Sequence, residues 1–200
     1  MLRVSGLSFD YDDKPLLSKI TFAVHPGMVF HVRGKNGAGK TTLLKLLAGL
    51  YEPQQGEIYF QDKPILNDRS VYQQQLSYLG HKTGLNNLLT VRENYQMGLF
   101  PGLEDPLLND AAIRLGLAEL LDTYCGELSA GQQRRASLLR LLLAKTQLWL
   151  LDEPFNGLDD KGVSYLTGII TDHVAQRGSV ILTSHQTFSI QHDLVKEYHL

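Results

Sequence analysis

The nine residues Gly34-Lys35-Asn36-Gly37-Ala38-Gly39-Lys40-Thr41-Thr42 constrain the fold of this chain more than any other stretch. They match the phosphate-loop pattern G-x-x-x-x-G-K-[ST] at every fixed position. An apolar segment at 28–32 reads as a strand before the loop, and 42–48 reads as a helix after it. Glycines let the backbone wrap around phosphate oxygens, and a helix N-terminus favours an anion. The sequence therefore predicts a phosphate-binding strand–loop–helix unit rather than a chance glycine-rich turn.

Within this loop two side chains have specific expected roles. Lys40 is expected to reach the β- and γ-phosphates of a nucleotide, and the Thr41 hydroxyl is placed to ligate Mg²⁺. The remaining loop residues are expected to contact the nucleotide through their backbone. The predicted nucleotide contacts of the loop are Gly34, Lys35, Asn36, Gly37, Ala38, Gly39, Lys40, Thr41 and Thr42.

The composition is that of an ordinary globular protein of 200 residues, with 43% hydrophobic and 20% charged residues. A net charge of −2 gives no general attraction to nucleic acid, so we expect no nucleic-acid partner. Cys125 is the single cysteine, which excludes an internal disulfide and a cysteine-cluster metal site. No apolar run is long enough to span a bilayer, so we expect no direct membrane insertion and a membrane role only through a partner.

Apolar segments alternate with helical patterns along the chain, which predicts a single α/β domain over 1–200. An antiparallel β subdomain is expected at the N-terminus, before a parallel core. A helical insertion is expected at about 83–140, where turns such as Pro101-Gly102 and Asp105-Pro106 interrupt leucines at helical spacing. The expected strands are 2–9, 20–24, 28–32, 57–60, 76–80, 147–151 and 178–184. Further helices are expected at 42–48, at 128–145, which begins within the insertion, and at 159–176.

Polar residues follow two of the apolar strands, where an open α/β sheet binds its ligands. Asp152 and Glu153 follow the buried run 147–151, and His185 follows 178–184. Asp152 suits Mg²⁺, Glu153 can deprotonate an attacking water, and His185 can contact a γ-phosphate. The alternatives are a carboxylate pair that merely ends a strand and a structural, hydrogen-bonding histidine.

A second anion site is predicted where Leu128-Ser129-Ala130-Gly131-Gln132 opens a helix. Ser129 and Gly131 there offer a hydroxyl and backbone N–H groups under the positive end of the helix dipole. If the insertion holds this site away from the phosphate loop of the same chain, the simplest ligand is the nucleotide of a second copy. The alternative is an ordinary helix N-cap.

These motifs, in this order and with Gly157-Leu158-Asp159 between them, resemble the ATP-binding cassette (ABC) ATPases over essentially the whole chain. Ala130 departs mildly from the usual Leu-Ser-Gly-Gly-Gln. The resemblance implies a phosphate-loop NTPase core of the RecA-like type, the two subdomains described above, ATP with Mg²⁺, and a homodimer. It also implies that Tyr11 stacks on adenine, unless its ring simply packs. Lys40, Glu153 and His185 would be catalytic, Thr41 and Asp152 would serve Mg²⁺, and Asp159 would lie at the dimer seam.

The run Tyr78-Leu79-Gly80-His81, followed by Leu89-Thr90-Val91-Arg92-Glu93-Asn94, is similar to the heme-exporter ATPases of bacterial cytochrome c maturation. That resemblance implies integral membrane partner subunits and a peripheral location on the cytoplasmic face of the bacterial inner membrane. His81 stands where ABC ATPases usually carry a glutamine. We expect it near ATP, coupling nucleotide state to the partner surface, with a purely structural imidazole as the alternative.

Three other functions are compatible with parts of this pattern. An ABC transporter ATPase for another cargo shares every motif. A soluble ABC ATPase of translation usually carries two cassettes, and one of DNA repair carries a long coiled coil; the sequence has neither. A non-hydrolysing nucleotide switch is disfavoured by the intact pair Asp152 and Glu153.

Overall fold

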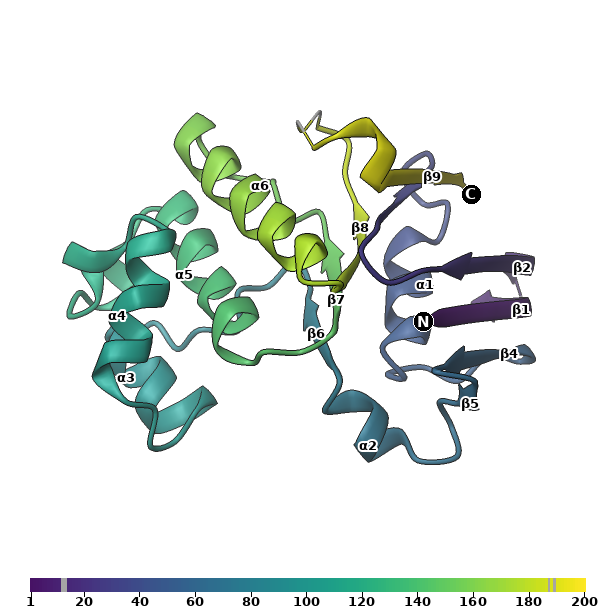
Figure 1. The fold of residues 1–200 in the computed structure, drawn as a ribbon, viewed down its shortest axis with the longest axis horizontal. Coiled ribbons are helices and arrows are strands. Elements are labelled where there is room, and N and C mark those ends of the chain that lie inside the picture. Colours follow the sequence, from purple (N-terminus) through teal and green to yellow (C-terminus); the bar gives the residue numbers. More distant parts are fainter. Residues whose placement is uncertain (12–13, 187, 189) are drawn as a thin grey trace. The chain divides into compact units, whose positions relative to one another are not determined.

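The computed structural model describes residues 1–11, 14–186, 188 and 190–200, and its elements are labelled in Figure 1. The chain forms two compact units. The first comprises 1–80, 146–154 and 173–200, and the second comprises 81–145 and 155–172. The second unit therefore contains the expected insertion. It also includes the five residues 141–145 that follow Arg140 and the later segment 155–172.

An antiparallel sheet opens the first unit, with strand order β2-β1-β4-β5. Its second strand is longer than the predicted 20–24, because β-bulges let β2 stay paired with β1 as far as the Tyr11–Lys14 pair. The strands are β1 (Leu2–Tyr11), β2 (Lys14–Val24), β4 (Gln55–Phe60) and β5 (Lys63–Pro64).

A parallel sheet of order β6-β7-β8-β3-β9 forms the other layer of this unit. All residues of β7 and β8 are buried, as their continuous apolar runs predict. The strand β9 was not predicted; it lies at the sheet edge, where three of its five residues are exposed and its apolar signal is weak. The strands are β3 (Val29–Arg33), β6 (Leu76–Leu79), β7 (Leu148–Asp152), β8 (Ser179–Thr183) and β9 (Val195–His199).

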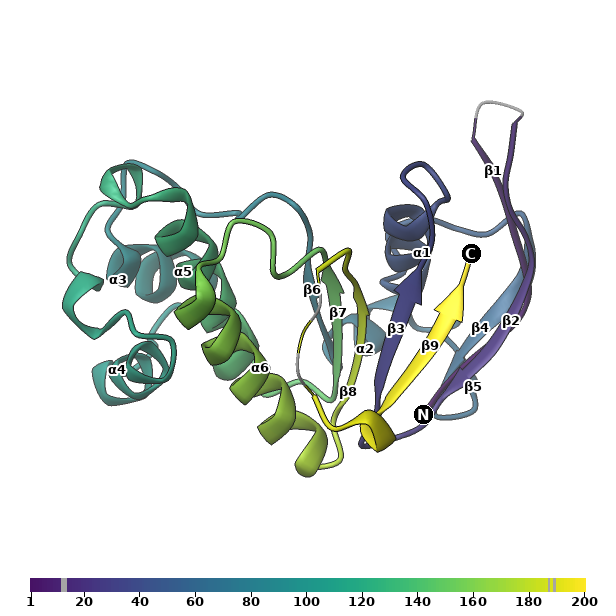
Figure 2. The same cartoon turned by 90° about the horizontal axis from the view of Figure 1, so that it is seen from above.

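The helix α1 (Lys40–Leu47) lies between the two sheets, as Figure 2 shows. Four leucines at its buried positions, Leu43, Leu44, Leu46 and Leu47, join side chains from both sheets in one hydrophobic core. Gly49 follows the helix with φ +67°, the left-handed conformation that glycine commonly adopts just after the end of a helix. This core fixes the start of α1, and with it the phosphate loop, against the ends of the parallel strands. The short helices α2 (Arg69–Gln73) and η4 (His192–Leu194) complete the unit.

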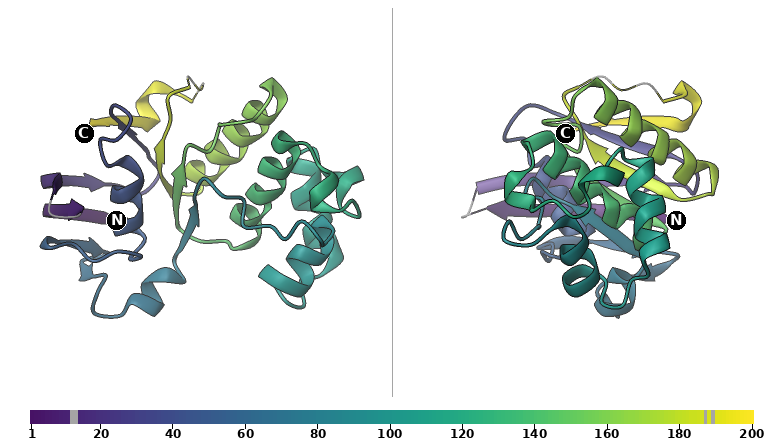
Figure 3. Two further views of the ribbon diagram at one scale, coloured as in Figure 1. Left: turned by 180° about the vertical axis from the view of Figure 1, so that it is seen from behind. Right: turned by 90° about the vertical axis from the view of Figure 1, so that its left-hand side faces the viewer.

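The second unit is built of helices and connecting loops (Figure 3). Thr90 and Glu93 form a capping box that starts α3. Asp105 and Pro106, which we predicted as a turn, instead begin α4. Proline is tolerated there because the backbone N–H that it lacks would have no hydrogen-bond partner in the first turn of a helix. The helices are α3 (Val91–Glu93), the π-helix η1 (Asn94–Leu99), α4 (Asp105–Arg114), η2 (Ala118–Leu120), η3 (Cys125–Glu127), α5 (Ala130–Leu143) and α6 (Asp160–Ala175), whose last three residues belong to the first unit.

Candidate nucleotide-binding and catalytic site

The phosphate loop connects β3 to α1 and depends on glycine at two positions. Gly37 has φ +83° and Gly39 has φ +92°, conformations that other residues rarely adopt. A Cβ atom on Gly39 would also lie 2.9 Å from Cδ2 of Leu17 on β2. The loop is therefore shaped by backbone freedom and by packing against the antiparallel sheet.

The ammonium group of Lys40 lies within this loop. Its Nζ donates to the carbonyl oxygens of Gly34, at 2.8 Å, and Lys35, at 3.2 Å. The same Nζ lies 3.2 Å from Nε2 of His185, which follows β8. The side chains of Lys40 and His185, 145 positions apart in the sequence, thus meet at the carboxyl ends of neighbouring strands.

Asp152 ends β7 and is 1% exposed, with both carboxylate oxygens hydrogen-bonded. Oδ2 accepts from the Thr41 hydroxyl at 2.8 Å, and Oδ1 accepts from the Thr183 hydroxyl at 2.9 Å. A hydroxyl and a carboxylate at this distance are the hard oxygen donors that Mg²⁺ prefers beside a nucleotide. The residues present therefore fit the magnesium site that the sequence predicts.

Glu153 follows Asp152 and leaves the strand in a left-handed conformation, with φ +47°. Its backbone N–H donates to Oγ1 of Thr183 at 2.9 Å, which holds this unusual turn. The side chain is buried, Oε2 accepts from the His185 backbone N–H at 3.3 Å, and Oε1 lies 3.5 Å from His185 Nε2. The turn thus places the Glu153 carboxylate beside His185, whose ring also contacts Lys40.

Thr183 is a residue of this site to which we assigned no role from the sequence. Its single hydroxyl accepts from Glu153 and donates to Asp152, so it joins the two acidic residues. The available signal is its place as the last residue of a buried strand, two positions before His185. A buried hydroxyl there has to find partners on a neighbouring strand.

The start of α5 has the geometry of a capped helix. Ser129 Oγ accepts from the backbone N–H of Gln132 at 3.3 Å, and Gln132 Oε1 accepts from the Ser129 N–H at 2.8 Å. Ser129 and Ala130 are exposed, whereas Leu128 is buried and anchors the turn. A Cβ atom on Gly131 would lie 2.8 Å from the Gly157 carbonyl oxygen, so the close backbone approach requires glycine. Because Ser129 Oγ accepts here, its own hydrogen stays available for donation to an anion.

The other predicted site residues fall in both units. Tyr11 ends β1 with its side chain 58% exposed, so its ring is not part of the core. Asp159 caps α6, accepting from the Gly162 N–H at 2.8 Å, and His81 is exposed. The first unit holds Tyr11, the phosphate loop, Asp152, Glu153 and His185, and the second holds His81, 128–132 and Asp159.

Comparison with known proteins identifies the class to which this arrangement belongs. The ABC transporter family matches residues 17–156. The cytochrome c biogenesis ATP-binding export protein CcmA of Legionella pneumophila (strain Lens) is 45% identical over the full length of both chains. The protein of that name from Vibrio cholerae is 43% identical over 93% of this chain and 91% of its own.

Solved structures with a similar fold are also ABC transporter subunits. An ATP-binding subunit of an ABC transporter superposes with a TM-score of 0.83 at 27% identity, covering 92% of this chain and 79% of its own. CbiO1 of Clostridium perfringens, part of the ABC transporter complex CbiONQ, gives 0.78 at 27% identity, covering 92% and 78%.

The chain therefore belongs to the ABC transporter family, as one of its ATP-binding, ATP-hydrolysing subunits. This confirms the predicted family and fold. Membership of this family implies that the protein works with membrane transporter subunits. Within the described part of the chain, none of the helices has the length and apolarity that crossing a membrane requires.

Proposed function

We propose that this protein is the ATPase subunit of an export complex that serves cytochrome c biogenesis through the handling of heme. The observation that carries this proposal is the 45% identity, across both full chains, to an export protein of that process. The protein would attach to the cytoplasmic face of the bacterial inner membrane through integral membrane subunits.

The proposed chemistry uses the cluster at the ends of β3, β7 and β8. Lys40 exchanges its loop carbonyls for the β- and γ-phosphate oxygens of ATP. Thr41 and Asp152 would hold Mg²⁺, which when bound neutralises charge on the phosphates. Glu153 orients a water and takes its proton, and His185, beside Lys40, contacts the γ-phosphate.

The proposed working form is a homodimer that closes around two ATP molecules. Residues 128–132 of one copy would bind the nucleotide on the phosphate loop of the other, with Asp159 at the seam. The exposed Ser129 hydroxyl and the start of the fourteen-residue helix α5 support this assignment. Tyr11 would stack on adenine, and the exposed His81 would couple nucleotide state to the membrane subunits.

The biological role is tested in cells whose own copy of this gene is deleted and replaced by a variant copy. Cells producing Lys40→Ala should lose c-type cytochromes, measured by heme staining of membrane proteins, because phosphate binding requires the ammonium group. The matched control is Lys63→Ala, an exposed lysine on β5 that should support wild-type levels. Normal cytochromes in Lys40→Ala cells, with the variant present at wild-type amounts, would show that the ATPase serves another cargo.

A further inference from the structure

His31 on β3 is a buried histidine outside the ATP site, 2% exposed. Its Nε2 lies 3.0 Å from the backbone carbonyl oxygen of Ser184. Because a carbonyl can only accept, the ring hydrogen sits on Nε2. Nδ1 in turn accepts from Arg33 Nε at 3.4 Å. The ring is thus a neutral imidazole with a partner at each nitrogen.

The residue that His31 holds comes immediately before His185. Ser184 is buried, and its hydroxyl closes a small turn by donating to the carbonyl of Gln186 and accepting from the Gln186 N–H, both at 2.9 Å. The next N–H, that of His185, donates to Glu153. Two contacts therefore fix the peptide group that links Ser184 to His185: His31 binds its carbonyl oxygen, and Glu153 accepts from its N–H.

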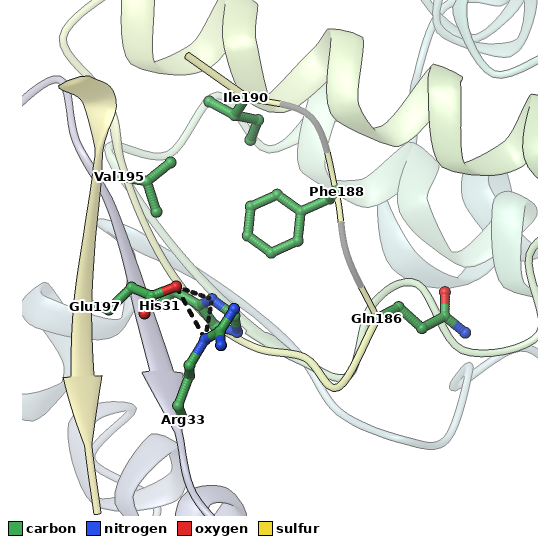
Figure 4. A pocket seen from close by; sticks show the side chains of 7 residues that line it. All are labelled: His31, Arg33, Gln186, Phe188, Ile190, Val195 and Glu197. Carbon is green, nitrogen blue, oxygen red and sulfur yellow. Dashed lines mark hydrogen bonds and ion pairs between the residues drawn. The ribbon is translucent and has the colours of Figure 1, made fainter. Parts of the chain in front are cut away.

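The surroundings of His31 keep its ring in one orientation. Figure 4 shows it with Arg33 from the same strand and Glu197 from β9, and all three line a cavity of about 420 Å³. Glu197 Oε1 lies 2.9 Å from Arg33 Nε and 3.8 Å from His31 Nδ1, and the Phe188 ring is centred 5.2 Å from the imidazole. The carboxylate of Glu153, the residue that follows β7, also acts on the ring and works against the lowering of its pKa. Burial lowers the pKa of His31, so the neutral form, which suits both contacts, prevails at neutral pH.

We propose that His31 is a positioning residue for ATP hydrolysis: it holds the Ser184–His185 backbone so that the His185 imidazole stays beside Lys40 and Glu153. This inference rests on the proposed catalytic role of His185. It predicts that the hydrogen bond from His31 Nε2 affects turnover through His185, and leaves ATP binding by the phosphate loop intact.

Three substitutions at His31 separate the hydrogen bond from packing. His31→Leu fills the space but cannot donate, and the amide of His31→Asn is too short to reach Ser184. The amide of His31→Gln can reach it. Leaving a buried carbonyl without a donor should lower kcat by about 5- to 30-fold in the Leu and Asn variants, with ATP affinity within about twofold of wild type. His31→Gln should recover most of the rate, and the exposed His25→Leu is the control expected to match wild type.

The deciding measurement combines these variants with His185→Ala. If His31 acts through His185, adding His31→Leu or His31→Asn to His185→Ala should lower kcat no further. An equal loss with and without His185 would overturn the proposal, as would wild-type kcat in His31→Asn. Full turnover by His185→Ala alone would instead refute the role of His185 on which the inference rests.

Discussion

At the scale of single residues, Glu153 is the position on which the proposed chemistry most depends. Its left-handed backbone turns the carboxylate out of the line of β7 and toward His185. A non-glycine residue in that conformation persists only where its surroundings hold it, and Thr183 supplies the holding hydrogen bond. Strain of this kind at a strand end is common where a side chain has to meet a substrate.

Replacement of Glu153 by glutamine tests its role as base. The amide keeps the size of the carboxylate and can still accept from the His185 N–H, but it cannot take a proton from water. Glu153→Gln should therefore bind ATP normally and turn over 10²–10⁴-fold more slowly, the usual effect of removing a positioned base. ATP affinity and single-turnover rate are the measurements, with the exposed Glu57→Gln as control. Wild-type turnover would remove Glu153 from the mechanism.

Sequence reasoning at this scale selects candidate residues inside a motif and misses the residues that hold them in place. Lys40, Asp152 and His185 are each recognisable from a short local pattern. Thr183 and His31 act through hydrogen bonds to residues 31 and 153 positions away. Those pairings depend on which strands are neighbours and in what register, which no local pattern specifies.

At the scale of elements, buried strands and long helices are the easiest to predict. The continuous apolar runs of β7 and β8 indicate central strands, because strands covered on both faces carry apolar residues throughout. The wrong predictions concern sheet edges and element ends: β9 has three of its five residues exposed, β2 extends beyond its apolar core, and α4 has a proline in its first turn. Each depends on pairing or capping that the hydrophobic pattern does not record.

The N-terminus of α5 is the element for which a partner chain is proposed, and mixed dimers test it. Lys40→Ala removes one phosphate loop, and Ser129→Arg blocks one helix start. In a dimer with one chain of each variant, each site would combine the phosphate loop of one chain with the α5 start of the other. One site then contains both substitutions, and the second site contains neither. Equal mixing should then restore about a quarter of wild-type ATPase activity from two inactive proteins. Recovery is measured after verified subunit exchange, with each variant alone as control, and no recovery would exclude reciprocal sites.

At the scale of the whole molecule, the first unit carries two histidines whose burial ties its stability to pH. His31 is described above, and His173 stacks on the buried Trp149, with ring centroids 3.9 Å apart. Burial lowers the pKa of both from the ordinary value of 6.5. Below pH 6.5 these two histidines bind protons in the unfolded chain but not in the folded chain. The unfolding free energy therefore falls as pH drops from 6.5 toward the lower folded-state pKa values, and it rises in the opposite direction.

Urea unfolding between pH 7.5 and 5.5 measures this dependence. Each histidine contributes at most about 1.4 kcal/mol per pH unit to the slope, because that is the linkage value of one proton. His31→Gln and His173→Gln should each flatten the decline in unfolding free energy below pH 6.5, whatever their effect at pH 7.5. His25→Gln changes a solvent-exposed histidine in the turn before β3, so its slope should match that of wild type. If all three variants keep the wild-type slope, the pH dependence comes from other groups, and neither buried imidazole resists protonation in the folded chain.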